Sequence, residues 1–144
     1  NITLVKSQTE YVLSRLEVVN GIKTFIPEDT VSRSMFGQAP YVFNAILNYR
    51  LDSLALDLSV SYNIQGRKLV ITSADGTPDI FEMPRHMFDF KANKRFGNHV
   101  SLSLRIQNIL NQSTKRTYFG DGYEQDYDAY RFGTTYLLGL TYKL

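Results

Sequence analysis

The side chains best suited to binding a ligand lie in the stretch TYFGDGYEQDYDAYRF, residues 117–132. Aromatic rings are interspersed there with carboxylates; rings can stack on a sugar or a flat chelate, and carboxylates accept hydrogen bonds from hydroxyl groups or bind cations. The alternative is a solvated loop that packs only against itself. We expect a ligand-contacting loop formed by Tyr118, Phe119, Asp121, Tyr123, Glu124, Asp126 and Tyr127.

The rest of the sequence holds no pattern typical of catalysis. It has no cysteine, and its two histidines, His86 and His99, are far apart, which argues against a metal centre. There is no glycine-rich phosphate loop and no nucleophile elbow. The formal charge is only +2, from 16 basic and 14 acidic residues, so nothing indicates nucleic-acid binding. The sequence predicts no enzyme, no metal and no cofactor.

The elements that position these residues are predicted to be β-strands. In SLALDLSVSYNIQ, residues 53–65, apolar and polar side chains alternate with the period of two that an extended strand with two unlike faces requires. Nothing requires a helix, except a weak turn within residues 8–19. Similar alternation indicates further strands in residues 41–51, 86–96, 100–108 and 135–144, and the first seven residues are expected to form one more.

The lengths of the connections between these strands are the most informative feature. Only Asp-Ser follows Leu51, and only Gly-Asn-His follows Phe96, so both connections are tight hairpin turns. Residues 8–37, 66–85 and 110–130 are expected to be long connections. Transmembrane β-barrels alternate short turns with long loops in this way, whereas connections beyond about 12–15 residues are uncommon in soluble domains. We therefore predict an all-β fold made of antiparallel, up-and-down transmembrane β-barrel strands.

This fold assigns a medium to each face of the strands. A charge on the lipid face near mid-membrane costs about 2–4 kcal/mol, so the charged rows are expected inside. The apolar rows are expected to face lipid through Leu54, Leu56, Leu58, Val60, Phe88, Phe90, Leu102 and Leu104. The polar rows are expected to face a wet lumen through Asp57, Asn63, Gln65, Asp89, Lys91, Arg105 and Gln107.

Two alternatives remain open at this point. A soluble barrel of the lipocalin kind would turn the same apolar rows inward around an apolar ligand. The count of about six strands is also too small for closure, because the smallest spanning barrels have eight. Either two strands are hidden in residues 8–36, giving a small eight-stranded outer-membrane barrel, or residues 1–144 are the C-terminal segment of a larger barrel.

Four motifs that occur in order favour the larger barrel. The motifs are the Gln-x-Pro-Tyr, YN-x-x-G, E-M-P-R…D and N-I-L-N patterns at Gln38–Tyr41, Tyr62–Gly66, Glu82–Asp89 and Asn108–Asn111. Over about residues 36–144 the chain resembles the C-terminal barrel strands of TonB-dependent outer-membrane receptors, in particular the Bacteroidetes type with a carboxypeptidase-regulatory-like domain.

The resemblance implies a 22-stranded barrel with a plug domain that is absent from this chain. It implies a receptor and transporter that imports a nutrient, such as a glycan, a peptide or a siderophore, across the outer membrane of a Gram-negative bacterium. The implied partners are outer-membrane lipid, the rest of the barrel and plug, the energy-transducing TonB complex, the assembly machinery and a surface lipoprotein. The row that resembles the signal for the assembly machinery is Tyr136, Leu138, Leu140, Tyr142 and Leu144, although that signal usually ends in an aromatic residue.

Overall fold

The computed structural model describes residues 1–72, 77–120 and 122–144. Their regular structure is all β, apart from one 3₁₀ turn at Asp52–Leu54, and every strand pairing is antiparallel, which confirms the all-β prediction. The strands are β1 (Ile2–Leu4), β2 (Gln8–Val19), β3 (Ile22–Ser34), β4 (Tyr41–Leu51), β5 (Leu56–Gln65), β6 (Lys68–Ile71), β7 (Asp79–Glu82), β8 (His86–Phe96), β9 (Val100–Gln107), β10 (Thr114–Gly120), β11 (Tyr123–Tyr130) and β12 (Thr135–Tyr142).

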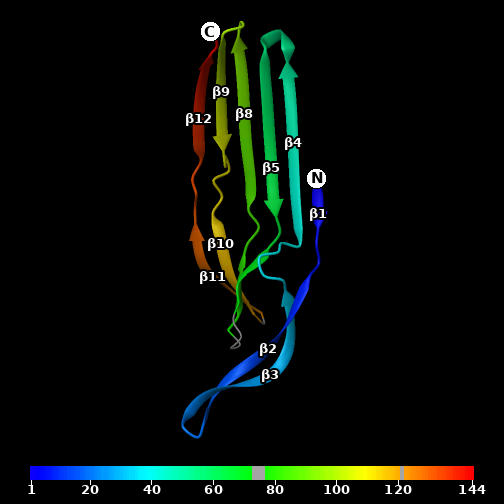
Figure 1. Cartoon of the computed structure of the whole chain (residues 1–144), viewed down its shortest axis with the longest axis vertical. Coiled ribbons are helices and arrows are strands. Elements are labelled where there is room, and N and C mark those ends of the chain that lie inside the picture. Colours follow the sequence, from blue (N-terminus) through cyan, green and yellow to red (C-terminus); the bar gives the residue numbers. More distant parts are fainter. Residues whose placement is uncertain (73–76, 121) are drawn as a thin grey trace.

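The largest sheet contains the five segments that the alternation of side chains identified, together with a short strand from the first seven residues. Its strand order is β1-β4-β5-β8-β9-β12, so strands that follow one another along the sheet also follow one another in the sequence. The β4–β5 and β8–β9 turns lie at the same end of this sheet as the C-terminus (Figure 1). The sheet is open within the described residues, because β1 and β12 form its two edges and no pairing joins them.

The long connections are not devoid of strands, and the expectation of a weak turn within residues 8–19 is wrong. β2 and β3 pair along their length, and Asn20 and Gly21 between them have φ angles of +52° and +80°. Asn-Gly between two apolar runs is the preferred sequence for a two-residue hairpin turn, because both positions need positive φ. This hairpin pairs with no strand of the six-stranded sheet, so its strands do not complete an eight-stranded barrel.

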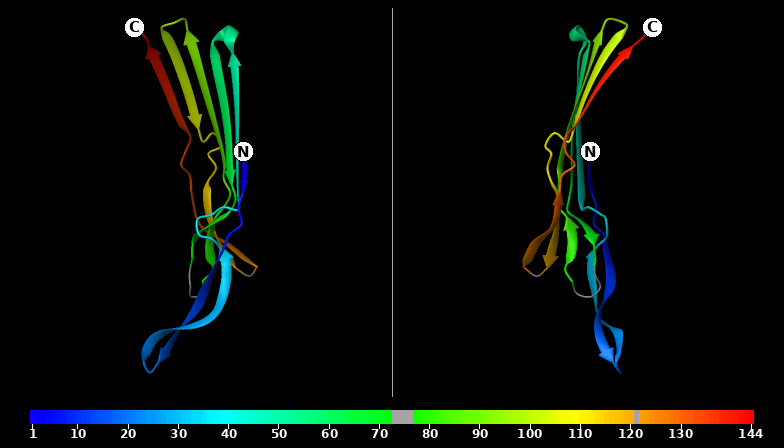
Figure 2. Two further views of the ribbon diagram at one scale, coloured as in Figure 1. Left: turned by 45° about the vertical axis from the view of Figure 1, so that its right-hand side comes forward. Right: turned by 90° about the vertical axis from the view of Figure 1, so that its left-hand side faces the viewer.

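The other two long connections form a second sheet, with strand order β6-β7-β10-β11. We call it the outer sheet, and the six-stranded sheet the inner sheet. This order repeats that of β5-β8-β9-β12, because each outer strand is the continuation of an inner one after a short break. β2 and β3 extend β1 and β4 in the same manner. All these extensions lie beyond the end of the six-stranded sheet that is opposite the C-terminus (Figures 1 and 2).

The breaks form a band across the molecule, which we call the junction: residues 5–7, 35–40, 66–67, 83–85, 108–113 and 131–134. Asn108 is central to it. Its backbone N–H donates to Asp89 Oδ1 (2.8 Å), its side-chain amide donates to the carbonyl of Gly133 (2.7 Å), and its carbonyl accepts from the Thr134 hydroxyl (3.1 Å). Side chains therefore replace the regular ladder where the strands are interrupted.

Few side chains of the described residues are buried, and all of these except Asn108 in the junction belong to the outer sheet. Leu69 and Ile80 are 1% and 4% exposed, and Thr117 is 1% exposed. The accessible surface of the chain is 10371 Å², whereas a compact monomer of this mass exposes about 7,500 Å². The six-stranded sheet thus has no core of its own.

Candidate functional site

One face of the six-stranded sheet is apolar over nearly its whole area. The register pairs Leu47 with Val60, Val60 with Phe90, Phe90 with Ile106, and Ile106 with Tyr136. An apolar row therefore crosses from β4 to β12 without interruption. The face is uncovered: Leu47 is 70% exposed and Leu138 is 74% exposed.

The residues expected to face lipid share this face, with one exception. Leu56, Leu58 and Val60 on β5, Phe88 and Phe90 on β8, and Leu102 and Leu104 on β9 lie in its apolar rows. Leu54 was wrongly placed in a strand: it ends the 3₁₀ turn that precedes β5. The turn closes in a left-handed residue, Ala55 (φ +47°), and this reversal takes Leu54 out of the strand's alternation.

The opposite face carries the polar residues. The register pairs Asn44 with Asn63, Ser59 with Lys91, and Lys91 with Arg105. The residues expected to face a lumen, Asp57, Asn63, Gln65, Asp89, Lys91, Arg105 and Gln107, all lie on it. The register thus places the residues expected to face lipid, except Leu54, on one face of the sheet and the residues expected to face a lumen on the other.

Charged side chains on the polar face form one paired group. Asp57 accepts from Arg50 Nε at 2.6 Å and lies 3.9 Å from Arg95 Nη2. Lys91 and Arg105 are directly opposite each other, and no ion pair of either is present within the described residues. Like charges in opposed positions repel, so this face is better suited to contact with water or acidic groups than to burial against apolar side chains.

The predicted ligand loop is a hairpin, and its described side chains contact different neighbours. Tyr118 and Tyr127 make an edge-to-face contact, with ring centroids 5.4 Å apart. Phe119 packs instead on Phe81, at 5.8 Å, within the outer sheet. Asp126 pairs with Lys115 at 3.6 Å. Glu124 is exposed, Tyr123 begins β11, and Asp121 lies outside the described residues.

The outer sheet also carries a row of alternating charges that sequence inspection did not reveal. Lys68, Glu82, Arg116 and Asp128 are successive partners across the four strands. Lys68 Nζ lies 3.0 Å from Glu82, and Arg116 Nη1 lies 3.3 Å from Asp128. The contributing segments are far apart in the sequence, and only the pairing of β7 with β10 brings the row together.

The C-terminal row lies on the apolar face of β12. Tyr136, Leu138, Leu140 and Tyr142 are 65–74% exposed, and Leu144 lies beyond the end of the strand. β12 pairs only with β9, so its other edge has no partner within the described residues.

Within the described residues, no cluster of three or more His, Cys, Asp or Glu side chains suited to a metal ion is present. Within the same residues, no helix has the length and apolar character needed to cross a membrane.

Comparisons with known proteins supply no family for this chain. No family model matches it, and neither the curated proteins nor the solved structures include a significant match.

Proposed function

We propose that the chain contributes membrane-spanning strands to an outer-membrane β-barrel of the TonB-dependent receptor type. The observation that carries the proposal is the apolar face, which is in register over five strands from β4 to β12, is interrupted only by Lys94 at one end, and is not covered by any other described element. A surface of that size is stable in lipid, whereas monomeric soluble proteins rarely leave one exposed to water. The polar face then lines the interior.

The open edges support membership of a larger barrel. β1 pairs with only the first residues of β4, so most of β4 has a neighbour on one side only, as does β12. In lipid each unpaired backbone group costs several kcal/mol, which requires further strands at both edges. The four sequence motifs support the same assignment, because all of them adjoin or overlap the junction where the strands leave the six-stranded sheet.

Spin labels test which medium each face contacts. The chain is placed in lipid or detergent with labels at Val60 and Leu104 on the apolar face, and at Ser59 and Arg105 on the polar face. We expect oxygen to relax the labels at 60 and 104, and a water-soluble relaxation agent to reach those at 59 and 105. Labels at 60 and 104 that are shielded from both agents would indicate a core, as in a soluble lipocalin-like barrel.

Epitope tags test the orientation of the barrel in cells. A tag between Asn20 and Gly21 is expected to be detected on intact cells, because long extensions of such barrels lie outside. A tag in the Gly97–His99 turn is the matched control, and we expect its detection only after permeabilisation. Equal detection of both tags on intact cells would contradict the proposal.

Import is tested by growth of cells that lack the protein. Growth is measured with a glycan, a peptide digest or ferric citrate as the sole source of carbon, nitrogen or iron. A defect on one of them, together with loss of its uptake when a protonophore removes the energy source, is the expected result. Normal growth on all three would contradict import of these classes.

A further inference from the structure

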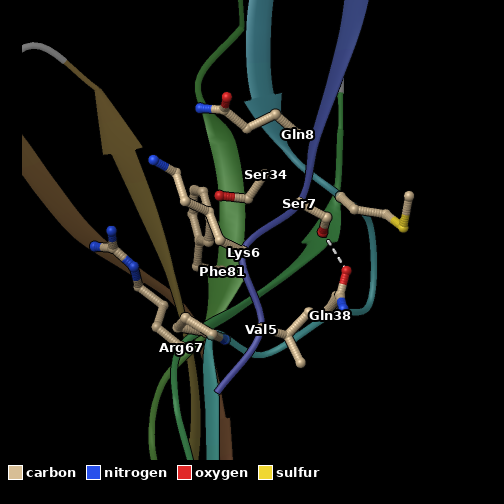
Figure 3. A pocket seen from close by; sticks show the side chains of 10 residues that line it. Val5, Lys6, Ser7, Gln8, Ser34, Gln38, Arg67 and Phe81 are labelled. Carbon is tan, nitrogen blue, oxygen red and sulfur yellow. Dashed lines mark hydrogen bonds between the residues drawn. The ribbon is translucent and has the colours of Figure 1, made fainter.

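A small pocket lies at the junction, where three connections meet strand β7. Its walls come from the β1–β2 connection, the β3–β4 connection, the residue after Gly66, and β7 (Figure 3). The volume is about 210 Å³, which equals the space of about seven water molecules in the liquid. The lining residues are Val5, Lys6, Ser7, Gln8, Ser34, Met35, Gln38, Pro40, Arg67 and Phe81.

The lining carries positive charge and no carboxylate. Lys6 and Arg67 are its two cations, and the other polar groups are hydroxyls and amides. The nearest acids of β7 already have partners, since Asp79 pairs with Arg33 at 2.8 Å and Glu82 pairs with Lys68 at 3.0 Å. The pocket therefore has an unbalanced positive charge among its lining residues.

Arg67 is held in place by aromatic rings. Its guanidinium lies 4.8 Å from the centroid of Phe81 and 4.4 Å from that of Phe119. Contacts of this kind hold the guanidinium without neutralising it, so the charge stays available to an anion. In Figure 3 the Lys6 and Arg67 side chains extend toward the same side of the pocket, and Ser7 and Gln38 are hydrogen-bonded on the other side.

The pocket continues the polar face rather than the apolar one. Val5, Pro40 and Arg67 are two residues beyond Thr3, Val42 and Gln65, which lie in the polar rows of β1, β4 and β5. An anion that reaches this pocket thus arrives along the polar side of the sheet, away from the surface suited to lipid tails.

We infer that this pocket binds the phosphate or carboxylate group of a small water-soluble ligand, through Lys6 and Arg67. Hydrogen bonds in which donor and acceptor are both charged are the strongest polar contacts available to such a group. The volume of about 210 Å³ suits an anionic end group, and the open side of the pocket leaves room for the rest of the ligand. This inference does not rest on the proposed membrane function, because it holds whichever medium covers the apolar face.

The test is a titration of the isotope-labelled full chain, in uncharged detergent micelles, with sodium phosphate and separately with citrate. Saturable shifts are expected for the amide resonances of Ser7 and Gln38 with at least one anion. Lys6→Gln and Arg67→Gln are each expected to weaken binding about tenfold or more. Raising the salt concentration is expected to weaken it further through screening.

Lys23→Gln is the matched control, because it removes the same charge at the far end of β3. Arg67→Gln also removes the contacts with both rings, whereas Lys6→Gln leaves them intact, so the Lys6 variant separates anion binding from loss of structure. Absence of a saturable shift, or equal affinity in the Lys6, Arg67 and Lys23 variants, would overturn the inference. Shifts that require anionic lipid would also overturn it, by assigning the cations to a lipid headgroup.

Discussion

The six-stranded inner sheet and the four-stranded outer sheet follow the same strand order, yet they are stabilised differently. The outer sheet buries Leu69, Ile80 and Thr117 and carries a row of paired charges. The inner sheet leaves both of its faces open. The outer sheet thus packs as soluble proteins do, whereas the inner sheet depends on something outside the chain to cover its apolar face.

The largest expected difference between the two sheets concerns the same substitution in each. Leu69→Ala should destabilise the outer sheet by about 2–5 kcal/mol, because it leaves a cavity at a buried position. Leu140→Ala, at a residue 74% exposed, should have a much smaller effect. Denaturant titration in micelles, monitored by hydrogen exchange of each sheet, measures both. Equal losses would show that the inner sheet has a core of its own.

A charge introduced on each face tests which face of the inner sheet contacts lipid. Leu104→Arg should cost about 2–4 kcal/mol in lipid vesicles if this residue lies near the middle of the membrane. Ser103→Arg, the neighbouring residue on the polar face, should be tolerated. Urea titration of both variants in vesicles gives the difference in free energy of unfolding. A larger loss of stability for Ser103→Arg would show that lipid contacts the polar face, contrary to the proposal.

The charged row of the outer sheet predicts a smaller effect. Glu82→Gln removes the acid that stands between Lys68 and Arg116 in the register, and should destabilise the outer sheet by about 1–3 kcal/mol. Glu124→Gln makes the same change at an exposed residue of β11 and serves as the control. If hydrogen exchange of β7 and β10 is the same in both variants, the row contributes nothing to stability.

The smallest expected effect is at the turn before β5. Ala55 has positive φ, which costs a side chain with Cβ about 1–2 kcal/mol, and glycine loses part of that gain through its greater flexibility when unfolded. Ala55→Gly should therefore stabilise the inner sheet slightly, by less than about 1 kcal/mol. The midpoint of unfolding in micelles measures this, and a lower midpoint would contradict it.

The inner sheet was predictable from the sequence because one rule determines it. Alternation from Leu56 to Ile64 specifies a strand and its two faces, and short turns specify which strands are neighbours. The outer sheet is not predicted, because β6 and β7 have only four residues each and because β10 and β11 lie in or beside a segment predicted as a long connection. The β2–β3 hairpin agrees with the alternative that two strands lie within residues 8–36, but it forms a separate two-stranded sheet instead of completing a small barrel.

The candidate ligand residues show a second limit. Composition alone placed Tyr118 and Phe119 in one site, but adjacent residues in a strand point to opposite faces. Phe119 packs under Arg67 and Phe81, and Tyr118 contacts Tyr127. The pocket at the junction was equally out of reach, because Lys6 and Arg67 are brought together by pairings that no local pattern specifies.

The pairing of β7 with β10 also governs how this end of the molecule can move. Four residue pairs link the two connections, from Arg116 with Glu82 to Phe119 with Asp79. Neither hairpin can swing outward alone without breaking those backbone hydrogen bonds, so the pairing couples the two hairpins mechanically. A ligand that displaced the β10–β11 hairpin would therefore also displace β7, and with it the Phe81 wall of the junction pocket.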